Sequence, residues 1–527
     1  MRSVVLSGFA GTGKSTVAPL VASMLALPWV DTDREIEARA GVTVAELWRT
    51  RGEVVFRELE GEVVRAIFAE DVPRVVSFGG GTVTARELRH LALDRSFVVT
   101  LACRPETLMA SRLGELALRP TLVARDPLAR VRALLGDRED AYAECHLYLP
   151  TDDLSPEEAA ARIARASQCA RVAVALGSRS YGVDIVLDSP PALSQLLAGL
   201  APSSLLVVSD RNVLAARSAA LAAALEPIHV PVFEVTLDPG EENKTLASVE
   251  RIWSAALGNV DRDAVVVGFG GGVVGDLAAF AASTLLRGLR VVESPTTLLA
   301  MVDASVGGKT GFDVAAGKNL IGTFHQPSGV VGDLAHLTTL PHREFLCGLA
   351  EIAKVALACD ERLFLELEEN AERLAAMDLA ALSPVILRSI AIKARVVRED
   401  EREAAGRKLL NLGHTIAHAL EAAGGYASLR HGEAVAIGLV VECRIAERLG
   451  LSPAGLADRV ERVLARMQLP TAVPPEQLAA AWPLVANDKK RAGDVISLPL
   501  VTGVGACVVE AVSLRELTGA GSGSPHG

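Results

Sequence analysis

Two glycine-rich phosphate-binding signatures, one in each half of the chain, constrain the fold more than any other feature. The first, Gly8-Phe-Ala-Gly-Thr-Gly-Lys14-Ser15, follows the apolar residues 4–6, and the second, Gly270-Gly-Gly-Val-Val-Gly275, follows the apolar residues 265–267. A buried strand that ends in such a turn is typical of parallel α/β units. Because the two signatures lie so far apart in the chain, we predict two enzymes in one chain.

The first signature fits G-x-x-x-x-G-K-[ST], the turn that surrounds nucleotide phosphates with backbone N–H groups. Lys14 is expected to reach the β- and γ-phosphates of ATP, and the Ser15 hydroxyl to bind Mg²⁺. Gly11, Gly13 and Thr16 complete the predicted nucleotide-binding turn. A glycine turn with a solvated lysine is the alternative, and the agreement of spacing with the strand-turn-helix context disfavours it.

Bulk composition excludes several classes of protein. At 527 residues the chain is too long for one core and should form roughly three to four structural units. A net charge of −11 argues against a general nucleic-acid binder. The seven cysteines are scattered without a C-x-x-C pair, and no apolar stretch approaches the ~20 residues of a membrane span. We therefore expect a soluble cytoplasmic protein with small-molecule partners, without nucleic acid or membrane.

Strand-like apolar runs alternate with helical periodicity over two thirds of the chain, which predicts α/β domains with parallel sheets. Residues 1–167 are predicted to form a P-loop domain that ends with a helix beginning at Ser155. A strand pattern that opens at Arg171 places the boundary near residues 168–171, with a short linker. The predicted second and third domains are an α/β dinucleotide-binding domain at 172–340 and a mainly helical metal domain at 341–515. Residues 518–527, rich in Gly and Ser, are predicted to be a disordered tail.

Two acids follow the second predicted strand of the first domain. Asp31 could assist the Mg²⁺ shell, and Asp33, two residues further along extended backbone, could meet an acceptor hydroxyl. An isolated D-x-D pair is more often a solvated strand end, so these roles depend on the motifs around it.

Four further motifs accompany these acids: Phe56-Arg57-Glu58, Phe78-Gly-Gly-Gly-Thr82, Arg119-Pro120, and Arg138 with Tyr142. Together with the P-loop they make the whole segment resemble shikimate kinases. The resemblance implies that shikimate is held by Asp33, Arg57, Gly80, Gly81 and Arg138, and that Arg119 belongs to a mobile lid. A guanidinium recognises a carboxylate bidentately, whereas an isolated arginine would by default form a surface ion pair. Thr121 in the lid and Cys145-His146 after Tyr142 depart from the family pattern.

The second signature alone is weak evidence, because G-x-G-x-x-G is a frequent false positive. Glu293, eighteen residues after Gly275, imitates the ribose-binding acid of a Rossmann unit, but this strand is not the first of its domain. The lysines, histidines and glycine-containing loops that follow are stronger evidence for a functional site.

His414 and His418 are four residues apart on a predicted helix and so share one face. Thr415 stands where H-E-x-x-H requires glutamate, which argues against a metalloprotease. A single helical histidine is usually structural. Three histidines together with Glu351, among several lysines, favour a catalytic metal site instead.

The segment 172–512 closely resembles 3-dehydroquinate synthases, which use NAD⁺ and a divalent metal, normally zinc. The resemblance implies Glu351, His414 and His431 as ligands of Zn²⁺ (or Co²⁺). It implies nicotinamide-dinucleotide contacts from Asp210, Asn212, Glu241, Lys244, Gly271, Gly272, Asp276, Thr296, Thr297, Lys318 and Asn319. It implies substrate contacts from Asp303, Lys309, Lys354, Lys393, Arg407, Asn411, His418 and Lys489, with Arg287 reaching across the interface of a homodimer.

The expected pair of activities is therefore phosphorylation of shikimate and conversion of 3-deoxy-D-arabino-heptulosonate 7-phosphate to 3-dehydroquinate. Two alternatives remain. The second half could be a metal-dependent polyol dehydrogenase, although a simple polyol does not need the phosphate-binding Lys309, Lys393 and Arg407. One half could be a regulatory module without activity, against which the intact Lys14 and Glu351 argue.

Overall fold

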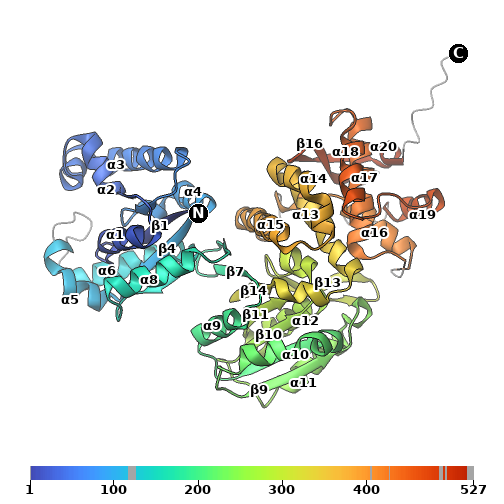
Figure 1. The fold of residues 1–527 in the computed structure, drawn as a ribbon, viewed down its shortest axis with the longest axis horizontal. Helices are drawn as coiled ribbons and strands as arrows, with labels where there is room; N and C mark the ends of the chain where they lie inside the picture. Colours follow the sequence, from blue (N-terminus) through green and yellow to red (C-terminus); the bar gives the residue numbers. More distant parts are fainter. Residues whose placement is uncertain are drawn as a thin grey trace. The chain divides into compact units, whose positions relative to one another are not determined.

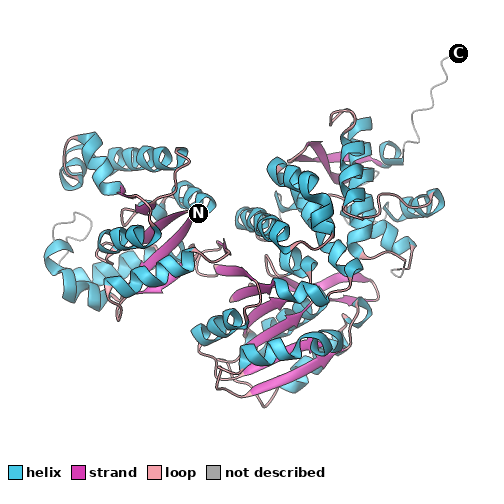
Figure 2. Ribbon diagram, in the orientation of Figure 1, coloured by secondary structure: helices cyan, strands magenta, loops and turns pink. Residues whose placement is uncertain are grey.

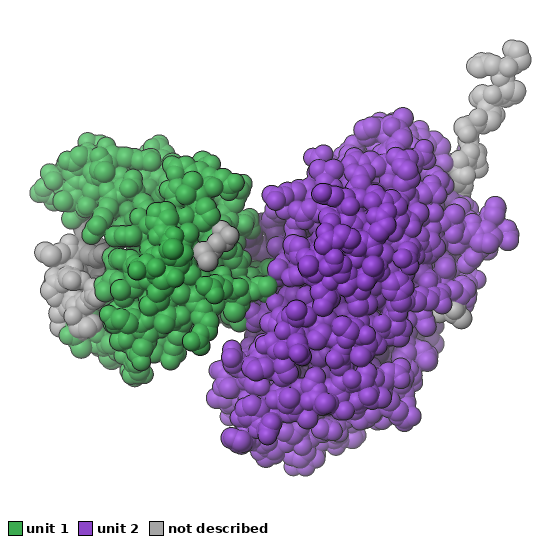
Figure 3. Space-filling view, in the orientation of Figure 1, with its two compact units in different colours: residues 1–182 green, residues 183–527 purple. Residues whose placement is uncertain are grey.

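The computed structural model describes residues 2–116, 126–403, 406–425, 428–485, 491–492 and 495–518. The chain divides into two compact units, Met1–Gly182 and Val183–Gly527 (Figure 3). The first unit thus extends beyond residue 167, where the sequence predicted the first domain to end.

The first unit is built on a five-stranded parallel sheet with the order β2-β3-β1-β4-β5. Its strands are β1 (Ser3–Gly8), β2 (Trp29–Asp31), β3 (Val75–Ser77), β4 (Ser96–Ala102) and β5 (Leu147–Pro150). Its helices are α1 (Lys14–Leu25), α2 (Thr32–Ala40), α3 (Val44–Ala69), η1 (Thr82–Thr84), α4 (Arg86–Arg95), α5 (Pro105–Leu116), α6 (Pro127–Asp137), α7 (Glu139–Ala143) and α8 (Pro156–Ser167) (Figure 1). The predicted α/β fold with a parallel sheet is confirmed.

Side chains of the central strand β1 point alternately to the two faces of this sheet, and each face has its own apolar core. In β1, Val4 and Leu6 pack in one cluster with α1 and α8, whereas Val5 packs in the other with α3. Successive side chains of a strand point to opposite faces, so a short all-apolar strand must be covered by helices on both sides. That burial holds the P-loop rigidly at the end of β1.

The second unit begins on a mostly parallel sheet with the order β6-β7-β14-β11-β10-β8-β9. The strands are β6 (Arg171–Val174), β7 (Tyr181–Val186), β8 (Leu205–Asp210), β9 (Val232–Leu237), β10 (Val265–Gly270), β11 (Arg290–Pro295) and β14 (Gly329–Asp333). Of these, β6 and the first two residues of β7 are counted with the first unit. Helices cover both faces (Figure 2): α9 (Pro190–Leu200) and α10 (Arg211–Leu225) lie on one, and α11 (Leu246–Ala256) and α12 (Gly272–Thr284) on the other.

A hairpin and three short elements lie between strands of this sheet in the chain, and a fourth short element follows the last strand. The hairpin consists of the antiparallel strands β12 (Lys309–Val314) and β13 (Gly317–Phe324). The short elements are η3 (Glu241–Asn243), η4 (Leu285–Arg287), η5 (Ala300–Ala304) and η6 (Leu334–Thr339).

The remainder is mainly helical, as predicted. It comprises α13 (His342–Cys359), α14 (Glu361–Ala375), α15 (Leu379–Glu399), η7 (Gly406–Asn411), α16 (His414–Ala423), α17 (His431–Arg448), α18 (Leu456–Arg466), α19 (Pro475–Val485) and α20 (Leu514–Thr518). A three-stranded antiparallel sheet of β15 (Arg491–Ala492), β16 (Val495–Gly503) and β17 (Ala506–Ser513), which the sequence analysis did not include, packs among these helices. In the described part of the chain no helix combines the length and apolar character that a membrane span needs. The predicted tail lies, after Thr518, outside the described residues.

Candidate functional site

The P-loop joins β1 to the N-terminus of α1, with Gly13 as the residue that caps the helix. The Lys14 ammonium folds back over the loop and donates to the carbonyl oxygens of Gly8 and Phe9, each at 2.8 Å. Lys14 is 8% exposed. The loop therefore presents a buried cation beside the helix N-terminus, an arrangement suited to a nucleotide's phosphates.

Asp31 connects this loop to the second strand. The Ser15 hydroxyl donates to Oδ2 of Asp31 at 2.9 Å, and Oδ1 of Asp31 accepts the backbone N–H of Asp33 at 3.0 Å. A hydroxyl and a carboxylate in contact beside the P-loop are the oxygen ligands that Mg²⁺ takes in nucleotide-binding sites. The two residues predicted as metal contacts are thus neighbours in space.

The triple glycine, residues 79–81, is the predicted floor of the acceptor pocket. A Cβ atom at Gly79 would lie 2.8 Å from Oδ1 of Asp33, and one at Gly81 would lie 2.5 Å from Nη2 of Arg57. Side chains at these positions would displace both polar groups. Asp33, Arg57 and the glycine backbone therefore converge on one place, as predicted for an acceptor site.

Two side chains from the region of α7 hold the middle of this loop. Arg138 Nη1 and the Tyr142 hydroxyl donate to the carbonyl oxygen of Gly80 at 3.2 and 2.5 Å. On the opposite side Glu60, 1% exposed, accepts from Arg57 Nη1 at 2.6 Å and from the Thr82 hydroxyl at 2.7 Å. Both predicted arginines are thereby oriented at the triple glycine.

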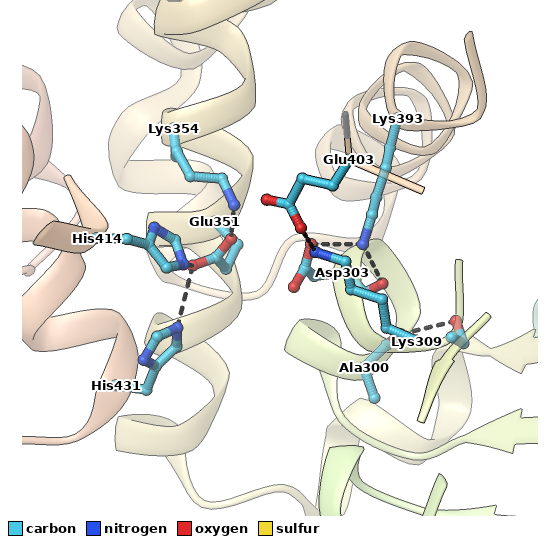
Figure 4. Close-up of polar contacts among 10 residues, drawn as sticks. Ala300, Asp303, Lys309, Glu351, Lys354, Lys393, Glu403, His414 and His431 are labelled. Atoms are coloured by element: carbon cyan, nitrogen blue, oxygen red, sulfur yellow. Dashed lines mark hydrogen bonds and ion pairs between the residues drawn. The ribbon is translucent and has the colours of Figure 1, made fainter. Parts of the chain in front are cut away.

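In the second unit Glu351, His414 and His431 place one donor atom each within 4.8 Å of one another. Oε1 of Glu351 lies 3.8 Å from Nε2 of His414 and 3.5 Å from Nε2 of His431. Figure 4 shows both rings beside this carboxylate. Oε1 is buried and accepts no hydrogen bond from the described residues. A carboxylate oxygen with two imidazole nitrogens is a donor set that suits Zn²⁺, so these residues fit a metal.

Lys354 sets the charge of this cluster by pairing with Oε2 of Glu351. Burial acts to raise the pKa of Glu351, but the adjacent Lys354 and His431 lower it to about 2. Burial and the charge of Lys354 hold the pKa of His414 well below its usual value. The charged Glu351 carboxylate and the neutral His414 imidazole are in the forms that bind a metal. Burial lowers the pKa of His431, but Glu351 and Glu421 raise it to about 10, so a metal has to displace a proton from this ring.

Opposite Glu351, His414 and His431 lies a group of lysines and acids (Figure 4). Lys393 donates to Oδ1 of Asp303 at 2.6 Å. Lys309 pairs with the Glu403 carboxylate, whose other oxygen accepts from Asn411 Nδ2 at 2.7 Å. Lys309 and Asn411, both predicted substrate contacts, thus already hold an anion between them.

The carboxyl ends of β8, β10 and β11 meet at one edge of the sheet and carry the predicted dinucleotide contacts. Asp210 ends β8, where it caps α10 by accepting the Asn212 N–H at 2.8 Å. Gly271 and Gly272 begin α12 after β10. The Thr296 N–H donates to Gly270 at 2.8 Å, and Thr297 lies beside Gly271. The carboxyl ends of the strands are where open α/β sheets bind dinucleotides.

Lys244 and, on the hairpin, Lys318 add two cations to these predicted contacts. Lys244 Nζ lies 2.5 Å from Oδ2 of Asp276 and 2.7 Å from Oδ1 of Asn319. Lys318 Nζ lies 3.9 Å from Glu241 and 3.7 Å from Glu421. The structure therefore brings together the predicted dinucleotide contacts from five separate segments.

Some predicted site residues have few contacts with the other site residues, and some lie outside the described residues. Arg287 is exposed, with a left-handed φ of 70°, and makes no ion pair with the described residues. His418 is exposed, its ring centroid 5.5 Å from that of His414. Arg119, Lys489 and the side chain of Arg407 lie outside the described residues.

Three acids beside these sites were not singled out from the sequence: Glu60, Glu403 and Glu421. Glu421 is 4% exposed, and its Oε1 lies 3.4 Å from Nδ1 of His431. It follows His414 by seven residues, about two helical turns, so the two side chains lie on the same helix face and the spacing was a usable signal. Glu60 follows Arg57 by three residues on α3, so a shared helix face could have indicated it as well. No sequence pattern indicates the contacts of Glu403.

Family models match three parts of the chain. The shikimate kinase model matches residues 10–168, the model for the N-terminal domain of 3-dehydroquinate synthase residues 234–347, and the model for its C-terminal domain residues 348–491. The 3-dehydroquinate synthase of Geobacter metallireducens is 41% identical over 347 residues, which are 66% of this chain and 96% of that protein. The enzyme of Pelobacter propionicus is likewise 41% identical over 349 residues, 65% of this chain and 96% of that protein.

Two solved structures share the fold of the second unit. The 2-epi-5-epi-valiolone synthase of Streptomyces hygroscopicus, with NAD⁺ and Zn²⁺ bound, is 31% identical with a TM-score of 0.58, covering 64% of this chain and 95% of that one. A 2-deoxy-scyllo-inosose synthase complexed with carbaglucose-6-phosphate, NAD⁺ and Co²⁺ is 25% identical with a TM-score of 0.59, covering 66% and 98%. With these matches, the chain belongs to the shikimate kinase family in its N-terminal part and to the 3-dehydroquinate synthase family in the remainder, as a fusion of the two.

Proposed function

We propose that the chain catalyses two reactions of aromatic biosynthesis. The first unit transfers the γ-phosphoryl group of ATP to shikimate, giving shikimate 3-phosphate. The second converts 3-deoxy-D-arabino-heptulosonate 7-phosphate to 3-dehydroquinate with release of phosphate. The observation that carries the proposal is the arrangement in the second unit, where a Glu/His/His cluster faces a group of lysines, combined with an intact P-loop and acceptor pocket in the first.

In the kinase reaction the chain's groups position and neutralise the reactants. Lys14, released from the loop carbonyls, holds the phosphoryl group in transfer, and Ser15 with Asp31 holds Mg²⁺. Arg57 and Arg138 bind the shikimate carboxylate. Asp33 accepts the proton of the attacking hydroxyl, because it lies at the triple-glycine floor where the ring would rest.

In the synthase reaction Glu351, His414 and His431 would hold the metal, and the residues at the carboxyl ends of the strands would hold NAD⁺. When bound, NAD⁺ supplies a hydride acceptor and the metal polarises the hydroxyl that is oxidised. Lys354 keeps Glu351 ionised. Lys309 and Asn411 hold an anion in the structure, the Glu403 carboxylate, and the substrate phosphate is the anion they would hold in the complex.

Several finer points belong to the same proposal. The domain bounds are 1–167, 172–340 and 341–515, and the protein is cytoplasmic. The synthase part forms a homodimer, and Arg287 of each subunit reaches into the site of the other subunit. The 41% identity to 3-dehydroquinate synthases over nearly their whole length supports this function over a polyol dehydrogenase.

The experiment is to assay the purified full chain for both reactions. Shikimate with ATP and Mg²⁺ should give ADP and shikimate 3-phosphate, and the heptulosonate phosphate with NAD⁺ and Zn²⁺ should give phosphate and 3-dehydroquinate. A chain that performs only one reaction would leave the other half as a binding module and overturn the bifunctional assignment.

A further inference from the structure

A turn that lies beyond the matched kinase family region packs against α7, the short helix that follows Arg138 and contains Tyr142. The match to the shikimate kinase model ends at residue 168, whereas the first compact unit extends to Gly182. Between β6 and β7, residues 176–180 form a tight turn. Ser180 braces it, because its hydroxyl donates to Gly177 O at 2.5 Å and accepts the Leu176 N–H at 2.9 Å.

Two successive backbone amides of this turn donate to two carboxylates of the kinase. The Gly177 N–H donates to Oε1 of Glu144 at 3.0 Å, and the Ser178 N–H to Oδ1 of Asp140 at 2.7 Å. Asp140 lies on α7 and Glu144 caps its C-terminus, four residues later. Like charges at this spacing destabilise a short helix, so donors to both carboxylates stabilise it.

Gly177 fits this place for two reasons. Its φ is +61°, a conformation that residues with a side chain rarely adopt, and a Cβ atom there would lie 2.6 Å from Oδ1 of Asp140. The turn backbone thus contacts the carboxylate directly.

From α7 the contacts continue to the acceptor pocket along two routes. Arg138, which precedes the helix, and Tyr142, within it, both donate to the Gly80 carbonyl. Glu144 Oε2 accepts from Nε of Arg89 at 2.5 Å, and Nη1 of the same arginine donates to Val83 O at 2.5 Å. Val83 follows the triple glycine in η1. Both routes therefore end on the loop that forms the pocket floor.

We propose that the turn at residues 176–180 is a positioning element of the kinase acceptor site, which it serves by holding α7, and with it Arg138, through Asp140 and Glu144. The inference rests on the proposed kinase function. The polar contacts of α7 with the pocket are to the acceptor floor, whereas Lys14 and Ser15 are held by the P-loop and Asp31. Loss of the turn contact should therefore weaken binding of the acceptor and leave binding of ATP nearly unchanged.

The test compares three variants of the full chain. Ser178→Pro removes the N–H that Asp140 accepts, and Ser178→Ala, the matched control, keeps it. Because proline also restricts the preceding residue, Asp140→Ala removes the same contact from the other side. A displacement of a binding group by even ~1 Å can cost a large factor, and we expect Ser178→Pro and Asp140→Ala each to raise the KM for shikimate on the order of tenfold. The KM for ATP should change less than about twofold, and Ser178→Ala should match the parent.

The double variant decides whether the two changes act through one contact. Ser178→Pro with Asp140→Ala should raise the shikimate KM no further than either change alone. Calorimetric titration of shikimate into each protein gives the same comparison without turnover, and an unchanged KM for ATP reports that the kinase unit is folded. An unchanged shikimate KM in Asp140→Ala, or an equal rise of both kinase KM values, would overturn the inference. A parent chain that does not phosphorylate shikimate would instead overturn the proposed function.

Discussion

The carboxylate of Glu421 lies 3.4 Å from Nδ1 of His431, while Nε2 of the same ring faces Glu351 at 3.5 Å. A carboxylate that accepts the N–H of one imidazole nitrogen keeps the lone pair on the other nitrogen free for a metal. Glu421 comes from α16 and His431 from α17, so the packing of two helices orients the ligand.

The first prediction concerns this pair. Glu421→Ala should weaken zinc binding about 10- to 100-fold, because His431 loses the partner that orients its ring. Glu421→Gln, which keeps a hydrogen-bonding side chain, should lose less. Competition with a chromogenic chelator measures the affinity directly, and equal affinities of all three proteins would contradict the role.

Removing the metal ligand itself should separate the two activities. His431→Ala, or dialysis against a chelator, should remove about one metal ion per chain and stop the synthase. The kinase should still run on added Mg²⁺, since its groups lie in the other compact unit. Metal analysis accompanies the two assays, and unchanged zinc in the variant would refute the ligand set.

Substitution of the P-loop lysine should remove the kinase activity and leave the synthase activity. Lys14→Met should lower shikimate phosphorylation by on the order of 10²–10³-fold or more, because a cation held on the transferring phosphoryl group is lost. Formation of dehydroquinate by the same chain is the internal control. Kinase activity close to that of the parent would show that Lys14 does not contact the phosphates.

A buried acid near the predicted dinucleotide contacts predicts a dependence of stability on pH. Burial, with a smaller contribution from the neighbouring Asp276, raises the pKa of Glu293 from 4.5 to about 8, although Lys393 opposes this. Between these values the folded protein retains a proton that the unfolded chain has released, so stability falls as pH rises from 4.5 to 8.

Glu293→Gln should therefore stabilise the protein by a few kcal/mol at pH 8 and by little at pH 4.5. Calorimetric unfolding at pH 5, 6.5 and 8 measures the difference, with the exposed Glu250→Gln as the control. If parent and Glu293→Gln show the same pH profile, the residue is ionised in the folded protein.

The exposed Arg287 allows a test of the proposed dimer. If it serves the partner's site, mixing inactive Arg287→Ala chains with inactive His414→Ala chains should restore part of the synthase activity, because a mixed dimer assembles one complete site. Mass photometry or crosslinking would establish that mixed dimers form. Without recovery in such dimers, Arg287 acts within its own chain or not at all.

Local sequence motifs predicted much of the fold and of the two candidate sites. The P-loop depends on a strand, a turn and a helix that are contiguous in the chain, and alternating apolar residues such as Val4, Val5 and Leu6 are enough to place a strand under helices on both sides. His414 and Glu351 were recognised because each lies in a dense motif that resembles a known family. For these residues, neighbours in sequence carry most of the information.

Tertiary packing decided the relationships between segments that are distant in the chain. No local pattern indicates that Glu403 lies between Lys309 and Asn411, that Glu421 orients His431, or that the amides of a turn at Gly177 meet two acids of the kinase. A hydrogen bond or ion pair of this kind depends on where whole helices and strands pack, and packing is set by the summed burial of many apolar side chains. The sequence by itself determined which chemistries the two halves contain, and the folded structure determined which side chains support them.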